Sequence, residues 1–219
     1  MKNSFIKVCG IQSLDEALGS IKAGANTIGL LLGLTHLAND EISPEAARGI
    51  VSELPDQIRT VMVTHLLDAD EIANLAKAVG VSAVQVHDNL PVEGMQKLRK
   101  DLPSIELIKA VHVQDETAIE YAKKYETCSD MLLLDSRTKD RLGGTGLTHD
   151  WSISSRLIKT VNIPVILAGG LNPSNINEAI DAVSPAGIDA NSGLENEDGS
   201  KSFKKIKAFA TAGLRCQLP

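Results

Sequence analysis

The chain has 219 residues, of which 43% are hydrophobic and 23% charged, and its formal net charge is -6. This length allows one large core or two small domains, and the composition is ordinary for a globular protein. The negative charge and the aromatic content of only 3% argue against a nucleic-acid-binding surface, which needs basic patches and stacking rings.

Short apolar runs alternate with amphipathic helical patterns from end to end. Each run is apolar enough for a strand covered on both faces, and the runs are Phe5–Cys9, Thr27–Leu32, Thr60–Thr64, Ala83–His87, Ile105–Val111, Met131–Leu134, Val165–Ala168 and Gly187–Ala190. The helical patterns cover residues 13–23, 44–53, 68–79, 92–101, 115–124, 152–160, 173–182 and 201–212. Ser13 is expected to cap the first helix, and Pro44 and Pro173 to lie in the first turns of theirs.

Strand–helix units fill the chain without a linker, which predicts a single-domain (β/α)8 TIM barrel spanning residues 1–219. A doubly wound open sheet is the alternative. It would typically have polar edge strands, whereas the first and last runs here are as apolar as the middle ones. In a barrel, functional residues lie at the C-terminal ends of the strands.

Cys9 and Asp135 end the first and sixth expected strands. Cys9 could act as a general base, and Lys7, on the same side of the strand, would favour its thiolate. The alternatives are a small buried side chain for Cys9 and a surface acid or helix cap for Asp135. Because barrel closure brings all strand ends to one mouth, the two form a candidate proton-transfer pair.

Glycines follow the seventh and eighth strands, at Gly169, Gly170 and Gly193, and the segment Gly143-Gly-Thr-Gly146 follows the sixth. Glycine lets backbone amides approach an anion, and the loops after strands seven and eight are the recurrent phosphate site of such barrels. Any one glycine pair is more often a simple turn. Together they predict binding of a phosphorylated small molecule.

The cysteines and histidines give no metal signature. Cys9, Cys128 and Cys216 lack metal or disulfide spacing, and no two histidines have helical ligand spacing. His87 and His112 end strands and could line the mouth, while the remaining histidines lie in expected loops. We expect no metal and no cofactor. With no signal peptide or membrane-spanning run, we expect a cytoplasmic protein without a membrane partner.

Motifs along essentially the whole chain carry a family resemblance. They are Lys7-Val-Cys-Gly-Ile11, Ile42-Ser-Pro-Glu-Ala-Ala-Arg48, Val84-Gln-Val-His87, Asp135 with Gly143-Gly-Thr-Gly146 and Asp150-Trp151, Leu167-Ala-Gly-Gly-Leu171 with Asn175, and Asp189-Ala-Asn-Ser-Gly-Leu-Glu195. In this order they resemble the phosphoribosylanthranilate isomerases. The resemblance implies a cofactor-free barrel that performs an Amadori rearrangement in tryptophan biosynthesis.

The resemblance also implies roles. Asp135 would be the general acid that opens the ribose ring, and Cys9 the general base that removes the C2 proton. The residues expected to hold the substrate or its phosphate are Lys7, His87, Gly144, Gly146, Gly169, Gly170, Asp189, Ser192 and Gly193.

One loop departs from the family pattern. Asp40 stands where the family has an arginine that resembles a clamp for the anthranilate carboxylate, and a carboxylate there would repel that group. His36, Arg137 or Arg141 could substitute for it. Two alternatives therefore stay open: a divergent paralogue acting on another N-phosphoribosyl amine, and a catalytically silent barrel that binds a phosphorylated ligand. We expect a monomer or a homodimer.

Overall fold

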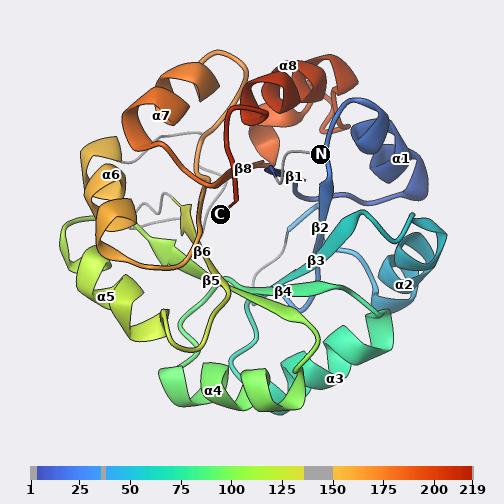
Figure 1. Ribbon diagram of the computed structural model, residues 1–219. Coiled ribbons are helices and arrows are strands. Elements are labelled where there is room, and N and C mark those ends of the chain that lie inside the picture. The colour runs from blue at the N-terminus through green and yellow to red at the C-terminus, as the bar shows by residue number, and fades with distance from the viewer. Residues whose placement is uncertain (1–3, 36–37, 136–149, 219) are drawn as a thin grey trace.

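The computed structural model describes residues 4–35, 38–135 and 150–218. Its eight parallel strands form a closed barrel in chain order, β1 to β8. The last strand pairs with the first, so the expected barrel is confirmed and the open sheet was the wrong alternative. Figure 1 shows the helices as a ring around the strands.

The bounds of the elements lie close to those expected from the sequence. The strands are β1 (Phe5–Val8), β2 (Thr27–Leu31), β3 (Arg59–Thr64), β4 (Ala83–Val86), β5 (Glu106–His112), β6 (Met131–Asp135), β7 (Val165–Leu167) and β8 (Gly187–Ala190). The helices are α1 (Leu14–Lys22), α2 (Pro44–Glu53), α3 (Ala69–Val79), α4 (Val92–Asp101), α5 (Thr117–Tyr125), α6 (Trp151–Thr160), α7 (Ile176–Val183) and α8 (Phe203–Gly213), with a short 3-10 helix, η1 (Ser192–Leu194).

Two of the three expected helix starts are confirmed. The Ser13 hydroxyl accepts a hydrogen bond from the amide of Glu16, and Pro44 is the first residue of α2. The expectation for Pro173 is wrong, because α7 begins only at Ile176. The side chain of Asn172 accepts a hydrogen bond from the Ser174 amide at 2.8 Å, and this local turn occupies the backbone where the helix was expected to start.

The apolar residues form two layers. Inside the barrel, side chains such as Phe5, Ile108, Leu133 and Ile166 make one cluster, and Leu218 near the C-terminus packs against it. The larger cluster lies between the strands and the surrounding helices. Within the described residues, no helix is long and apolar enough to cross a membrane.

Candidate active site

A cavity of about 1130 Å³ opens at the C-terminal ends of the strands. It brings together most of the predicted site residues that the structure describes. Those lining it are Cys9, Asp40, His87, Asp135, Gly169, Gly170, Asp189, Ser192 and Gly193. Lys7 is not among the described lining residues, because its side chain is fully buried.

Lys7 and Asp189 form a buried ion pair inside the barrel. The pairing of β1 with β8 sets Lys7 opposite Asp189, and the Lys7 ammonium donates a hydrogen bond to the Asp189 carboxylate at 2.9 Å. Burial opposes the positive charge, but the adjacent carboxylate outweighs it, so the pKa of Lys7 is raised. Lys7 therefore lies beneath the cavity, where its ammonium binds the carboxylate of Asp189, a residue that lines the cavity.

Cys9 lies next to Lys7, as the alternation along β1 predicted. Both side chains point toward Gly29 of β2, where an added Cβ would lie 2.8 Å from Lys7 Cε and 2.9 Å from Cys9 Sγ. Burial raises the pKa of the Cys9 thiol to about 11, although Lys7 acts in the opposite direction. The expected shift toward thiolate is thus outweighed by burial, and the Asp189 carboxylate raises the thiol pKa further.

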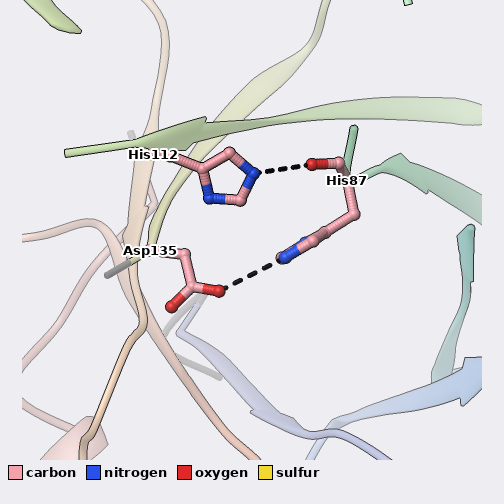
Figure 2. A group of neighbouring side chains, drawn as sticks. All are labelled: His87, His112 and Asp135. Carbon is pink, nitrogen blue, oxygen red and sulfur yellow. Dashed lines mark hydrogen bonds and ion pairs between the residues drawn. The ribbon is translucent and has the colours of Figure 1, made fainter. Parts of the chain in front are cut away.

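Asp135 lies at the end of β6 and is held by a histidine. His87 follows β4, and its Nε2 atom lies 3.3 Å from the Asp135 carboxylate (Figure 2). On the other side of that ring, Nδ1 lies 3.0 Å from the side-chain amide nitrogen of Gln85. The amide nitrogen can only donate, so Nδ1 accepts and Nε2 carries the proton that faces Asp135.

Two further histidines pack against His87. The His65 ring is stacked on it, with centroids 5.1 Å apart, and the His112 ring meets it edge-on at 5.0 Å. His112 Nε2 donates a hydrogen bond to the backbone carbonyl of His87 at 2.9 Å. Burial and the neighbouring His87 lower the pKa of His112 to about 4, so His112 is neutral at physiological pH.

The loops after β7 and β8 have backbone conformations that would let a ligand approach their main-chain amides closely. Gly169 and Gly170 both have positive φ angles, 81° and 69°, which favour glycine. A Cβ on Gly193 would overlap the carbonyl oxygen of Leu171, so no other residue fits there without a shift. Asn175 braces the first loop by donating to the Gly170 carbonyl at 2.9 Å.

A polar network that sequence reasoning missed borders the cavity near Cys9. Asn191 donates to the Asp40 carboxylate at 2.6 Å and accepts from Lys201 at 2.6 Å. Lys201 is almost completely buried and also pairs with Glu195 at 2.8 Å. Only the fold reveals this network, because its members lie on the loop after β2, the loop after β8 and the start of the α8 segment.

Four of the predicted site residues, together with the alternative clamp Arg141, lie outside the described part of the chain. They are His36, Arg137, Gly144 and Gly146. The proposed anion-binding segment after β6 and the three candidate partners for the amine side therefore stay predictions.

Comparison with known proteins matches this architecture to one family. The sequence profile of N-(5'-phosphoribosyl)anthranilate (PRA) isomerase matches residues 6–212. This chain belongs to the phosphoribosylanthranilate isomerase family. The isomerase is 44% identical to N-(5'-phosphoribosyl)anthranilate isomerase 2 of Methanosarcina mazei over 206 residues, covering 93% of this chain and 91% of that protein.

Solved structures give the same result. The isomerase is similar to a phosphoribosyl anthranilate isomerase in complex with reduced 1-(o-carboxyphenylamino)-1-deoxyribulose 5-phosphate, with a TM-score of 0.82 and 33% identity over 96% of this chain and 98% of the other. It is also similar to monomers generated from the dimeric enzyme of Thermotoga maritima, with a TM-score of 0.79, 33% identity and the same coverage.

Proposed function

We propose that this isomerase converts N-(5'-phosphoribosyl)anthranilate to 1-(2-carboxyphenylamino)-1-deoxyribulose 5-phosphate, a step of tryptophan biosynthesis. The observation that carries the proposal is that Cys9 and Asp135 line the same cavity as the glycine loops after β7 and β8. An acid, a base and an anion-binding wall are what an Amadori rearrangement of a sugar phosphate requires. The active unit is a monomer or a homodimer, the latter by analogy with the dimeric T. maritima enzyme.

Asp135 is the proposed acid of the first step. Its protonated carboxyl gives a proton to the ribose ring oxygen, the bond from C1 to that oxygen breaks, and the nitrogen lone pair forms an iminium ion. His87, at 3.3 Å, orients the carboxyl toward the cavity. The carboxylate left behind is stabilised by the Nε2 proton of His87, because a hydrogen bond to the ionised form favours it.

Cys9 is the proposed base of the second step. Its thiolate removes the C2 proton, the C2 electrons neutralise the iminium as an enolamine, and protonation at C1 with loss of the C2 hydroxyl proton gives the ketone. The free thiol has a pKa of about 11, so it must ionise in the complex. The positive iminium next to Cys9 favours that ionisation, since an opposite charge within a few ångströms lowers a thiol pKa. Hydrogen moves within one molecule, so the balance needs no oxidant or reductant.

The amide-rich loops are the proposed phosphate site. Gly169 and Gly170 after β7, and Ser192 and Gly193 after β8, lie on one wall of the cavity. Holding the phosphate there fixes the sugar between the ends of β1 and β6, where the base and the acid lie.

Variants of the two proton-transfer residues test the proposal. Cys9→Ala and Asp135→Ala should each lower kcat by at least about 100-fold with phosphoribosylanthranilate, because a positioned acid or base contributes roughly 10² to 10⁴ in rate. The matched controls are Cys216→Ala, a buried cysteine that is not among the described cavity-lining residues, and Asp181→Asn on the exposed face of α7. Both controls should keep near-parental turnover.

Near-parental turnover in either proton-transfer variant would remove that residue from the mechanism. A parent protein inactive on phosphoribosylanthranilate but active on an N-phosphoribosyl amine without a carboxylate would favour the divergent paralogue instead. The observation behind that second candidate is the Asp40 carboxylate on the cavity wall. No turnover of either compound would support the silent barrel.

A further inference from the structure

We propose that His87, His112 and Asp135 form a binding site for a divalent transition-metal ion of the zinc class, and that occupation of this site inhibits the isomerase. The cluster lies at the ends of the adjacent strands β4, β5 and β6. Each residue offers one ligand atom, and these atoms lie within 4.8 Å of one another. Figure 2 shows the three side chains converging from separate strands.

His112 is already arranged as a metal ligand. Its Nε2 atom donates to the carbonyl oxygen of His87, which can only accept, so the proton is on Nε2 and Nδ1 has a free lone pair. Nδ1 is buried and has no hydrogen-bond partner. Figure 2 shows it on the side of the ring that faces Asp135. Metal-binding histidines usually donate their other ring N–H to a carbonyl or carboxylate in this way.

His87 needs one tautomer change, and Gln85 supplies the means. As a ligand through Nε2, His87 must carry its proton on Nδ1, where the Gln85 amide nitrogen now donates. The other atom of that amide, Gln85 Oε1, is buried and has no hydrogen-bond partner. Rotating the amide by half a turn would bring Oε1 to the Nδ1 proton. Gln85 Oε1, which now has no partner, would then accept a hydrogen bond from the Nδ1 proton of His87 and hold this histidine in the tautomer that binds metal through Nε2.

The spacing suits a small ion. Zinc binds imidazole nitrogen and carboxylate oxygen at about 2.0–2.2 Å, which sets neighbouring ligand atoms of a tetrahedron roughly 3.4 Å apart. The His87 Nε2 to Asp135 Oδ2 distance is 3.3 Å. The three ligand atoms lie within 4.8 Å of one another, so closing them to this spacing would require shifts of about 1.4 Å at most. Two imidazoles and one carboxylate favour zinc, cobalt or nickel over magnesium and calcium, which prefer oxygen ligands.

Metal at this position would interfere with catalysis. His87 and Asp135 line the cavity, so the fourth ligand position would face bound substrate or water. A carboxylate that coordinates a metal cannot also carry the proton that opens the ribose ring. The inhibitory effect therefore rests on the proposed function of Asp135, whereas metal binding itself does not.

Direct binding to the chelator-treated full chain tests the site. Titration with Zn²⁺ should show one equivalent bound, and Co²⁺ should give the visible absorption of a nitrogen- and oxygen-ligated ion. His112→Gln should raise the Zn²⁺ dissociation constant at least about tenfold, because Gln removes the Nδ1 lone pair while its amide can still donate to the His87 carbonyl. Asp135→Asn should weaken binding similarly.

His65→Gln is the matched control, since His65 stacks on the same ring but is outside the three-residue cluster. It should leave the Zn²⁺ affinity unchanged within about twofold. Equal affinity of His112→Gln and the parent, or no stoichiometric binding to the parent, would overturn the site. If thermal melting shows that His112→Gln does not fold, His87→Gln takes its place in the binding measurement.

Activity separates this inference from the proposed function. Metal-free His112→Gln should turn over phosphoribosylanthranilate like the parent and require at least about tenfold more Zn²⁺ for half-inhibition. Equal inhibition of the two proteins would overturn the inhibitory role. A metal-free parent that is inactive yet binds zinc as described would refute the proposed function and leave the metal site standing.

Discussion

The protonation state of Cys9 depends on a residue far away in the chain. Lys7 is two residues before it and contacts the same glycine, yet the thiol pKa is about 11. Asp189 engages the lysine at 2.9 Å, and burial disfavours the thiolate. In the free protein Cys9 is therefore a neutral thiol, and in the proposed mechanism the charge of the bound substrate favours its ionisation.

The rate at which Cys9 reacts with iodoacetamide should report this pKa. We expect the rate in the ligand-free protein to rise about tenfold per pH unit from pH 7 to pH 10, because only the thiolate reacts. Peptide mass spectrometry after timed alkylation would distinguish Cys9 from Cys128 and Cys216, which are buried and not among the described cavity-lining residues. A rate that levels off below pH 9 would mean that Lys7 does lower the thiol pKa substantially.

Sequence reasoning reached Cys9 and Lys7 through the two-residue period of a strand, which is a local property. It could not reach the protonation state, because that depends first on burial in the closed barrel and then on Asp189, 182 residues from Lys7. The same limit explains why the histidine cluster was missed. Spacing along one helix reveals local ligand pairs, whereas His87, His112 and Asp135 lie at the ends of three different strands.

At the scale of elements, periodicity predicted nearly every strand and helix. Strands buried on both faces appear in the sequence as continuous apolar runs, and the helices appear as amphipathic spacing. The start of α7 was missed, since side-chain hydrogen bonds of Asn172 and Asn175 hold a turn that a proline-based rule does not anticipate. The loop after β2 could not be interpreted from local sequence either, because its Asp40 accepts a hydrogen bond from Asn191, a residue that only the fold brings close.

The charge of Asp40 should weaken binding of a carboxylated amine. We expect Asp40→Asn to lower KM for phosphoribosylanthranilate about fivefold, since removing one like charge near a surface is worth roughly 1 kcal/mol. Steady-state kinetics would measure this. Asp198→Asn is the matched control, because Asp198 also lines the cavity but is fully exposed and bonded within its own turn to Ser200. A KM that rises in Asp40→Asn would place Asp40 among the groups that bind the substrate.

One buried lysine, Lys109, lowers the free energy of unfolding of the whole molecule. Lys109 of β5 is fully buried, donates to the Ala110 carbonyl at 2.6 Å and lies near the rings of Tyr121 and Tyr125 on α5. Among the described residues, no carboxylate forms an ion pair with it. Burial lowers the pKa of Lys109 from 10.5 to about 7, against an opposing contribution from Asp88.

The free energy of unfolding should therefore rise with pH between about 7 and 10.5. In that window the unfolded chain keeps the lysine proton that the folded chain has lost, so raising the pH favours folding by up to about 1.4 kcal/mol per unit. Lys109→Met should stabilise the protein at pH 7 and flatten this dependence. Urea unfolding of both proteins from pH 7 to 9.5 would measure it; parallel curves would show that Lys109 stays charged in the fold.

The pairing of β1 with β8 has a consequence for synthesis of the chain. Lys7 leaves the ribosome early, but its counter-ion, Asp189, is synthesised only 182 residues later. Until β8 arrives, the first strand would have to bury an uncompensated ammonium, which is strongly unfavourable. Electrostatics therefore favours keeping the first strand hydrated and unpaired with β8 until β8 has been synthesised. We expect the Cys9 thiol to acquire its buried surroundings only in the last stage of folding.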